Sequence, residues 1–167
     1  MRLLSDDKDF LGILDQHKRI IFKICNSYCR NPESRKDLVQ EVVIQLWKSY
    51  PKYDPQYKIS TWIYRIALNV AISFYRKEKK HLHATSITES AMNVAMEGDS
   101  FDTERDILWL RRFIDQLDEL HRALMILYLD GNSYKDIADV LGITETNVAT
   151  KINRIKQKLK REFENIK

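Results

Sequence analysis

Apolar residues recur at spacings of three and four along most of this chain, which is the pattern of amphipathic α-helices. In the first half this pattern predicts helices at residues 6–30, 34–50 and 59–80. The prolines Pro32, Pro51 and Pro55 separate them, because proline interrupts a helix interior. The connector SYPKYDPQYKIS, between the second and third helices, is predicted to be a loop with three tyrosines.

The helix expected at 59–80 carries apolar side chains on two sides. At 100° per residue, one broad stripe should face a core, and it consists of Trp62, Ile63, Ile66, Ala67, Val70 and Phe74. The opposite side carries Leu68, Ile72 and Tyr75. A narrow polar lane separates the two sides and contains Arg65, Asn69, Ser73, Arg76 and Lys80. Such a helix either packs on two sides, or packs on one side and binds something flat on the other.

The helical pattern fails at residues 81–103, which are polar and weakly periodic and contain Gly98. We interpret this stretch as a flexible linker. Helical spacing resumes at Ile107 and continues to Leu127, predicting one helix that Gly131 ends. The expected fold is therefore all-α, with small helical domains at 1–80 and 104–167 joined by the linker 81–103. There is no internal repeat.

The segment GNSYKDIADVLGITETNVATKINRIKQKLK, residues 131–160, predicts a helix-turn-helix. Ser133 followed by Asp136 resembles a capping box, Gly142 permits a sharp reversal, and Thr144 can cap the next helix. The apolar stripe of that next helix is Val148, Ile152, Ile155 and Leu159. The opposite face carries Thr146, Thr150, Asn153, Arg154 and Gln157, flanked by Asn147 and Lys151. That face suits a DNA major groove, while an ordinary helical hairpin with a solvated face is the alternative.

The helix at 34–50 shows an isoleucine among polar groups. Its apolar side is expected to bury Leu38, Val39, Val42, Val43 and Leu46. The other side carries Asp37, Gln40, Glu41, Gln45 and Lys48, with Ile44 between them. An apolar anchor with a polar rim is typical of a small protein interface, but a solvated face fits equally well.

Composition adds one feature, the distribution of charge. The 167 residues hold 28 Lys and Arg against 24 Asp and Glu, a net charge of only +4. Basic residues nevertheless cluster at 76–80 and from Lys151 onward. Two separated clusters favour a polyanion that is met at two places, although two solvated helix ends would look the same.

Other function classes receive no support from the sequence. No apolar run approaches membrane-spanning length and the start lacks a signal-peptide core, so a cytoplasmic protein without membrane insertion is expected. Cys25 and Cys29 are expected to be buried thiols, because further metal ligands at suitable spacing are missing. His81 and His83 form an isolated pair without metal-site spacing. No nucleophile–base pairing or phosphate loop is present, so neither catalysis nor a cofactor or metal is expected.

Three motifs occur in order along the chain: DLVQEVVIQLW, TWIYRIALNVAISFYRK and SYKDIADVLGITETNVATKINRIKQKL. Together they resemble the bacterial RNA polymerase sigma factors, specifically the short extracytoplasmic-function (ECF) group that keeps only the second and fourth conserved regions. The resemblance covers nearly the whole chain. The family often has Leu-Pro before the first helix of its last domain, whereas here Asp118 follows Leu117.

The resemblance implies a promoter-specificity subunit that is not an enzyme. The implied partners are core RNA polymerase (the β′ coiled coil and the β subunit) and promoter DNA, with an anti-sigma factor as a further candidate. The implied polymerase-binding residues are Asp37, Gln40, Glu41, Ile44 and Trp47. Those implied to melt and hold the minus-ten element are Tyr53, Tyr57, Lys58, Thr61, Trp62, Arg65, Asn69, Arg76, Lys77 and Lys80. Those implied to bind the minus-thirty-five duplex are Ser133, Tyr134, Thr144, Thr146, Asn147, Thr150, Lys151, Asn153, Arg154 and Lys158.

Two other classes of protein compete with this interpretation. A duplex-binding transcriptional regulator, whose N-terminal domain senses a signal or dimerises, explains the helix-turn-helix equally well. It does not explain the two-sided helix at 59–80 or the polar patch around Ile44. A purely structural helical adaptor leaves both basic clusters unexplained.

Overall fold

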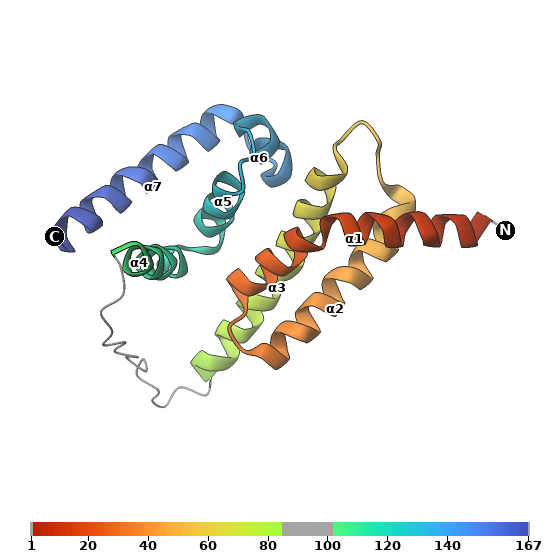
Figure 1. Cartoon of the computed structure of the whole chain (residues 1–167), viewed down its shortest axis with the longest axis horizontal. Helices are drawn as coiled ribbons and strands as arrows, with labels where there is room; N and C mark the ends of the chain where they lie inside the picture. The colour runs from red at the N-terminus through yellow and green to blue at the C-terminus, as the bar shows by residue number, and fades with distance from the viewer. Residues whose placement is uncertain (1, 85–101, 167) are drawn as a thin grey trace.

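The computed structural model describes residues 2–84 and 102–166, and all regular structure within these ranges is helical (Figure 1). The N-terminal half contains α1 (Arg2–Tyr28), α2 (Pro32–Ser49), the 3-10 turn η1 (Tyr50–Lys52) and α3 (Ile59–Ala84). The C-terminal half contains α4 (Asp102–Gln116), α5 (Glu119–Leu129), α6 (Tyr134–Leu141) and α7 (Glu145–Ile166). The predicted all-α fold with two helical regions is confirmed.

Local chemistry explains where the N-terminal helices begin and end. The Asn31 side chain accepts hydrogen bonds from the backbone N–H groups of Glu33 (2.9 Å) and Ser34 (3.2 Å), and α2 therefore starts at Pro32. The third helix begins at Ile59 as predicted but continues to Ala84, past the expected end at residue 80. Most of the predicted linker, residues 85–101, lies outside the described residues.

The single helix predicted from Ile107 to Leu127 is wrong, because two helices occupy this stretch. The backbone at Asp118 is extended (ψ 169°), and the Asp118 side chain accepts a hydrogen bond from the His121 N–H at 2.9 Å. It is therefore the N-cap of α5, and α4 ends at Gln116. The position where the family often has proline thus carries a helix-starting residue of another kind.

The helix-turn-helix has the capping residues that the sequence predicts. Ser133 Oγ accepts from the Asp136 N–H at 3.1 Å, and Thr144 Oγ1 accepts from the Asn147 N–H at 3.1 Å. Between these caps Gly142 ends α6 with a φ of +69°, a left-handed conformation that favours glycine. The buried side of α7 contains Val148, Ile152 and Ile155.

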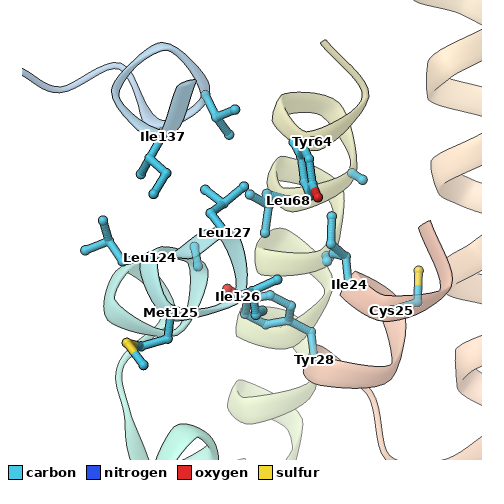
Figure 2. Close-up of a cluster of buried hydrophobic side chains, with 14 of the residues drawn as sticks. Ile24, Cys25, Tyr28, Tyr64, Leu68, Leu124, Met125, Ile126, Leu127 and Ile137 are labelled. Carbon is cyan, nitrogen blue, oxygen red and sulfur yellow. The ribbon is translucent and has the colours of Figure 1, made fainter. Parts of the chain in front are cut away.

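The third helix packs on both of its sides, which decides between the alternatives left open by its sequence. α1 and α2 lie against one side, and α6 lies against the other. Leu68, on the second side, is only 2% exposed, and Ile72 and Tyr75 pack against the same core. Figure 2 shows Tyr64 and Leu68 of α3 facing Ile126 and Leu127 of α5, with α1 beside them.

The buried side chains consequently form one continuous cluster through both halves of the chain, from Phe10 in α1 to Ile155 in α7. The sequence predicts two small helical domains joined by a linker. The described residues instead share a core across the contact between the halves.

Candidate nucleic-acid and partner interfaces

The exposed face of α2 carries the predicted polymerase-binding residues together. Asp37, Gln40 and Glu41 are exposed, and Gln45 Nε2 donates a hydrogen bond to Glu41 at 3.1 Å. Ile44 is 44% exposed, although the same helix buries Leu38, Val42 and Leu46 completely. The face of α2 opposite these buried residues therefore presents one exposed apolar side chain with polar groups around it, as the sequence pattern indicates.

Trp47 lies one turn beyond Ile44 on this face. It is 45% exposed, and its ring meets the Phe10 ring of α1 edge-on with centroids 5.0 Å apart. The indole is thus held by packing while nearly half of its surface faces solvent. A large side chain that is fixed before binding loses little conformational entropy in an interface.

A groove of about 420 Å³ between α2 and α3 connects two of the predicted sites. Its lining includes Glu41 from the polymerase-binding set and Asn69 and Lys77 from the minus-ten set. Gln45 and Ser73 also line it. They lie one turn from Glu41 and Asn69 respectively, and the sequence pattern already places Gln45 on the polar side of α2 and Ser73 in the polar lane of α3.

The loop before α3 gathers aromatic rings at the start of the helix. The Tyr53 hydroxyl donates to the Tyr57 carbonyl at 2.6 Å, and the Tyr53 ring lies 5.3 Å from the Trp62 ring. Tyr57 is 45% exposed, and the Arg65 guanidinium carbon lies 5.8 Å from the centre of its ring. A cation beside an exposed ring offers stacking and charge to an unstacked base and its phosphate.

The predicted minus-ten residues are not equally accessible. Thr61 is only 5% exposed, so its side chain offers almost no surface to DNA, because it falls on the packed side of the first turn of α3. Trp62 and Tyr53 are half-buried. The exposed members of the set on α3 are Arg65, Asn69, Arg76, Lys77 and Lys80.

Three of the predicted minus-ten cations contact the C-terminal half. Lys58 Nζ lies 3.1 Å from an Asp136 carboxylate oxygen, and Arg76 Nε lies 3.4 Å from Glu119. Arg65 donates a hydrogen bond to the backbone carbonyl of Asp139 in α6. Sequence patterns gave no indication of these pairs, because their members lie far apart along the chain.

The outer face of α7 presents the predicted duplex-reading residues to solvent. Thr146, Asn147, Thr150, Asn153, Arg154 and Lys158 are exposed, and Lys151 is half-buried. The Thr150 hydroxyl already donates to the Thr146 carbonyl at 3.0 Å, whereas its lone pairs stay available as acceptors. The face thus combines hydrogen-bonding groups with long cations.

Three other residues of the predicted minus-thirty-five set have structural contacts. Ser133 and Thr144 are the N-caps of α6 and α7, and both are exposed. Tyr134 is half-buried, with its ring 6.5 Å from that of Tyr128. Each lies at a helix start, where a backbone N–H group or hydroxyl can contact phosphate.

The sequence interpretation missed Arg122, a charged residue with 4% exposure in the contact between the halves. Its guanidinium carbon lies 5.2 Å from the centre of the Tyr28 ring and 4.8 Å from that of Tyr75. It donates to the carbonyls of Ser27 (3.2 Å) and Asp115 (2.6 Å). The available signal was the position of Arg122 directly before the apolar run ALMILYL. A cation in a buried helix must find buried partners.

The buried thiols fit the sequence prediction for this pair. Burial raises the pKa of the Cys25 thiol to about 12, and burial also raises the pKa of Cys29. In residues 2–84 and 102–166, no cluster of three or more His, Cys, Asp or Glu side chains could hold a metal ion. The helices of those two ranges are also too short or too polar to cross a membrane.

Comparison with known proteins connects these surfaces to one family. Residues 13–81 match the family model of sigma-70 region 2, and residues 107–159 match that of sigma-70 region 4. The RNA polymerase sigma factor SigZ of Bacillus subtilis is 31% identical over 129 residues, which covers 77% of this chain and 72% of SigZ. The chain is an RNA polymerase sigma factor of the ECF group.

Further relatives and solved structures agree with this assignment. The sigma factor is 26% identical over 173 residues to the ECF RNA polymerase sigma factor SigW of Bacillus subtilis, covering 97% of this chain and 92% of SigW. Its fold is similar to that of RpoE, solved with the anti-sigma factor NepR from Bartonella quintana (TM-score 0.72, 22% identity, 94% of this chain and 98% of that chain). It is also similar to CnrH, solved with the cytosolic domain of CnrY (TM-score 0.69, 19% identity, 95% and 90%). As a sigma factor, the protein is a non-catalytic factor that recognises promoters and supports transcription initiation.

Proposed function

We propose that the sigma factor divides its work among three surfaces, with α2 binding core RNA polymerase at the β′ coiled coil. The observation that carries this proposal is the exposed pair Ile44 and Trp47, 44% and 45% exposed, within the polar rim of Asp37, Gln40 and Glu41. An exposed apolar centre with acceptors around it supports a protein partner.

The loop before α3 and the polar lane of that helix then hold the non-template strand of the minus-ten element. Arg65, Asn69, Arg76 and Lys80 follow the phosphates, while Tyr57 and neighbouring rings offer surfaces to unstacked bases. Unstacking costs a few kcal/mol per base, so the protein must capture bases as they leave the duplex. The groove lined by Glu41 and Asn69 brings this strand close to the polymerase-binding face.

The C-terminal half contacts the minus-thirty-five element as a duplex. The exposed face of α7 enters the major groove, and the N-caps Ser133 and Thr144 lie where helix starts approach the backbone. The factor works where RNA polymerase works, in the cytoplasm. An anti-sigma factor is a further proposed partner, because the sigma factor RpoE, whose fold is similar, was solved in complex with the anti-sigma factor NepR.

The polymerase-binding surface is tested by placing a charge at its apolar centre. Ile44→Lys should weaken binding to core RNA polymerase about tenfold or more, because the interface would then bury an unpaired ammonium group. Binding is measured by fluorescence titration of labelled sigma factor with core enzyme. Ile107→Lys is the matched control, since Ile107 is 51% exposed on α4, away from α2.

The control variant should bind core polymerase like the parent protein. If Ile44→Lys, with its helical content unchanged, also binds as tightly as the parent, the α2 face is not the docking surface.

A further inference from the structure

A cavity of about 570 Å³ lies where the end of α1 and the start of α2 meet α4 and α5. Its charged lining consists of four basic side chains and two carboxylates: Lys23, Arg30, Arg35, Arg111, Asp115 and Asp130. Ion pairs join Lys23 to Asp130 and Arg30 to Asp115. The two carboxylates thus neutralise two of the cations, and the cavity keeps an excess of positive charge.

The excess charge belongs to two arginines on opposite walls. Arg35 of α2 donates only to backbone carbonyls, those of Cys29 at 3.1 Å and Arg30 at 3.0 Å. Arg111 of α4 is exposed and forms no hydrogen bond or ion pair with another described residue. A guanidinium group presents paired N–H donors whose spacing matches the oxygens of a phosphate group. These two positions are therefore suited to an anion.

A buried cation next to this cavity adds to its positive charge. A second cavity, of about 300 Å³, shares Arg30 and Asp115 with the first and is also lined by Arg122, which is only 4% exposed. The terminal nitrogens of Arg122 donate to backbone carbonyls, and its Nε has no hydrogen-bond partner in the described residues. Lys79 and Glu78, which also line the second cavity, offset each other in charge. The Arg122 charge meets no carboxylate, and a buried charge is screened little by solvent.

Apolar side chains form another part of the wall of the first cavity. Ile114 of α4 is half-buried there, and Leu129 of α5 is 54% exposed. Ile126, also of α5, lies deeper, at 6% exposure. A bare inorganic ion would leave these side chains in contact with water, whereas a ligand with an organic part would cover them. The volume of the cavity also lies within the range of about 300–1,000 Å³ that is usual for small-molecule sites.

We propose that this cavity binds a phosphorylated organic molecule of about nucleotide size. Its phosphate groups contact Arg35 and Arg111, and its organic part lies against Ile126 and Leu129. The lining residues belong neither to the polymerase-binding set nor to the two DNA-binding sets, so this inference does not depend on the proposed function. Because the ligand contacts α1 and α2 on one side and α4 and α5 on the other, it should stabilise the folded chain against unfolding.

The test is a calorimetric titration of the full-length sigma factor at low ionic strength, with adenosine diphosphate as the probe. Arg111→Gln should weaken binding about tenfold, because it removes charge-assisted hydrogen bonds to phosphate. Arg112→Gln is the matched control, since Arg112 is the neighbouring exposed arginine of α4 and does not line the cavity. This control should bind the probe like the parent protein.

A second pair of variants tests the opposite wall. Leu129→Glu places a carboxylate in the lining and should weaken probe binding about tenfold or more, because like charges repel. Its control is Leu120→Glu, on the same helix but outside the cavity, at a residue that is 37% exposed. The probe should raise the melting temperature of the parent and of both controls, and should raise it less in the two cavity variants. Far-ultraviolet circular dichroism verifies that all four variants keep their helices.

Pyrophosphate and adenosine, the two parts of the probe, identify the chemistry of the ligand. Each should bind more weakly than adenosine diphosphate, because each satisfies only one part of the cavity. Equal binding of pyrophosphate would overturn the organic part of the proposal, and equal binding of adenosine would overturn the phosphate part. If the parent does not bind the probe at millimolar concentration, the cavity is not such a site. If Arg111→Gln and Leu129→Glu bind as tightly as the parent, the probe occupies another basic surface and the proposal is wrong.

Discussion

Individual side chains on α7 differ in what they can contribute to promoter binding. Arg154 and Thr150 are exposed on the face opposite the buried Val148, Ile152 and Ile155, so they should point into the groove. Lys158 lies one turn further along, and its Nζ is 6.0 Å from the centre of the Phe113 ring of α4. A cation near that ring lies toward the edge of the reading face, where phosphates pass.

Arg154→Ala should therefore change which minus-thirty-five sequences are used. Losing a bidentate contact to a base costs about 1–3 kcal/mol and relaxes specificity at one base pair. Lys158→Ala should weaken all sequences alike and lower the salt slope by about one unit. Transcription from a library of randomised minus-thirty-five elements at two salt concentrations distinguishes the two effects. A uniform decrease across the library for Arg154→Ala would identify Arg154 as a phosphate contact instead.

Among the helices, α5 contributes buried side chains and hydrogen bonds to the contact between the two halves. It is short, Glu119–Leu129, yet six of its consecutive residues, Arg122 to Leu127, are buried. Its first turn supplies the Glu119 carbonyl to Tyr28, and its C-terminal neighbour Asp130 accepts from Tyr64. Hydrogen bonds at both ends of this helix therefore join it to the N-terminal half.

Asp118→Ala should lower the free energy of unfolding by about 1 kcal/mol, because the first-turn N–H of His121 loses its acceptor. Asp118→Ser retains an oxygen that can cap the helix, and it should preserve most of the stability. Urea unfolding followed by circular dichroism measures both values. Equal losses for alanine and serine would mean that the carboxylate charge matters and that capping does not.

The sequence predicted what depends on neighbours along the chain. The caps Ser133 and Thr144, the reversal at Gly142 and the buried stripe of α7 all follow from spacings of a few residues. The break at Asp118 was missed because the apolar spacing continues through it. The burial of Arg122 between two tyrosines of the other half could not be predicted, because no local pattern specifies which distant side chains will meet it.

The same distinction applies to the candidate sites. The exposure of Ile44 was predictable, because its position on the helix places it opposite Leu38 and Val42. The cations of α3 were correctly expected on an exposed lane, but the acceptors that reach Lys58 and Arg76 come from helices far along the sequence. Contacts of that kind depend on the packing of whole elements.

On the scale of the whole molecule, side chains of the N-terminal half lower the pKa values of two carboxyl groups in the C-terminal half. Burial alone would raise the pKa of Asp130, but hydrogen bonds from Lys23 and Tyr64 outweigh it and hold that pKa below its usual value. Burial alone would also raise the pKa of Asp136, but hydrogen bonds from Lys58 and Ser133 outweigh it and hold that pKa below its usual value. Burial, followed by the bond to Asp130, raises the pKa of the Tyr64 hydroxyl to about 12.

The free energy of unfolding should therefore fall on acidification. A carboxyl group whose pKa is lower in the folded than in the unfolded protein stabilises the fold at pH values above its ordinary pKa of 3.8. This contribution is lost as the pH falls through the folded-state pKa. Stability should change little between about pH 7 and 5 from these groups, and decrease below about pH 4. Urea unfolding across this range measures the slope.

Asp130→Asn provides the comparison for that slope, since the amide keeps the shape of the side chain without titrating. Its unfolding free energy should be lower than that of the parent at pH 7 and should fall less steeply in acid. An identical pH slope in the two proteins would show that the bonds to Lys23 and Tyr64 do not link Asp130 titration to folding.

The continuous core limits how freely parts of this protein can be exchanged. Engineers who want a new promoter specificity would graft the C-terminal half of another sigma factor onto residues 1–84. The graft would need more than a suitable recognition helix, because Tyr28, Tyr64 and Tyr75 contact groups of the C-terminal half. The incoming half would have to supply an arginine, a carboxylate and a backbone carbonyl at the same positions. A chimera without those partners would expose apolar surface from Leu68 to Tyr75 and should bind nonspecific nucleic acid and aggregate more readily. Compatibility of the two halves is therefore a design criterion in its own right.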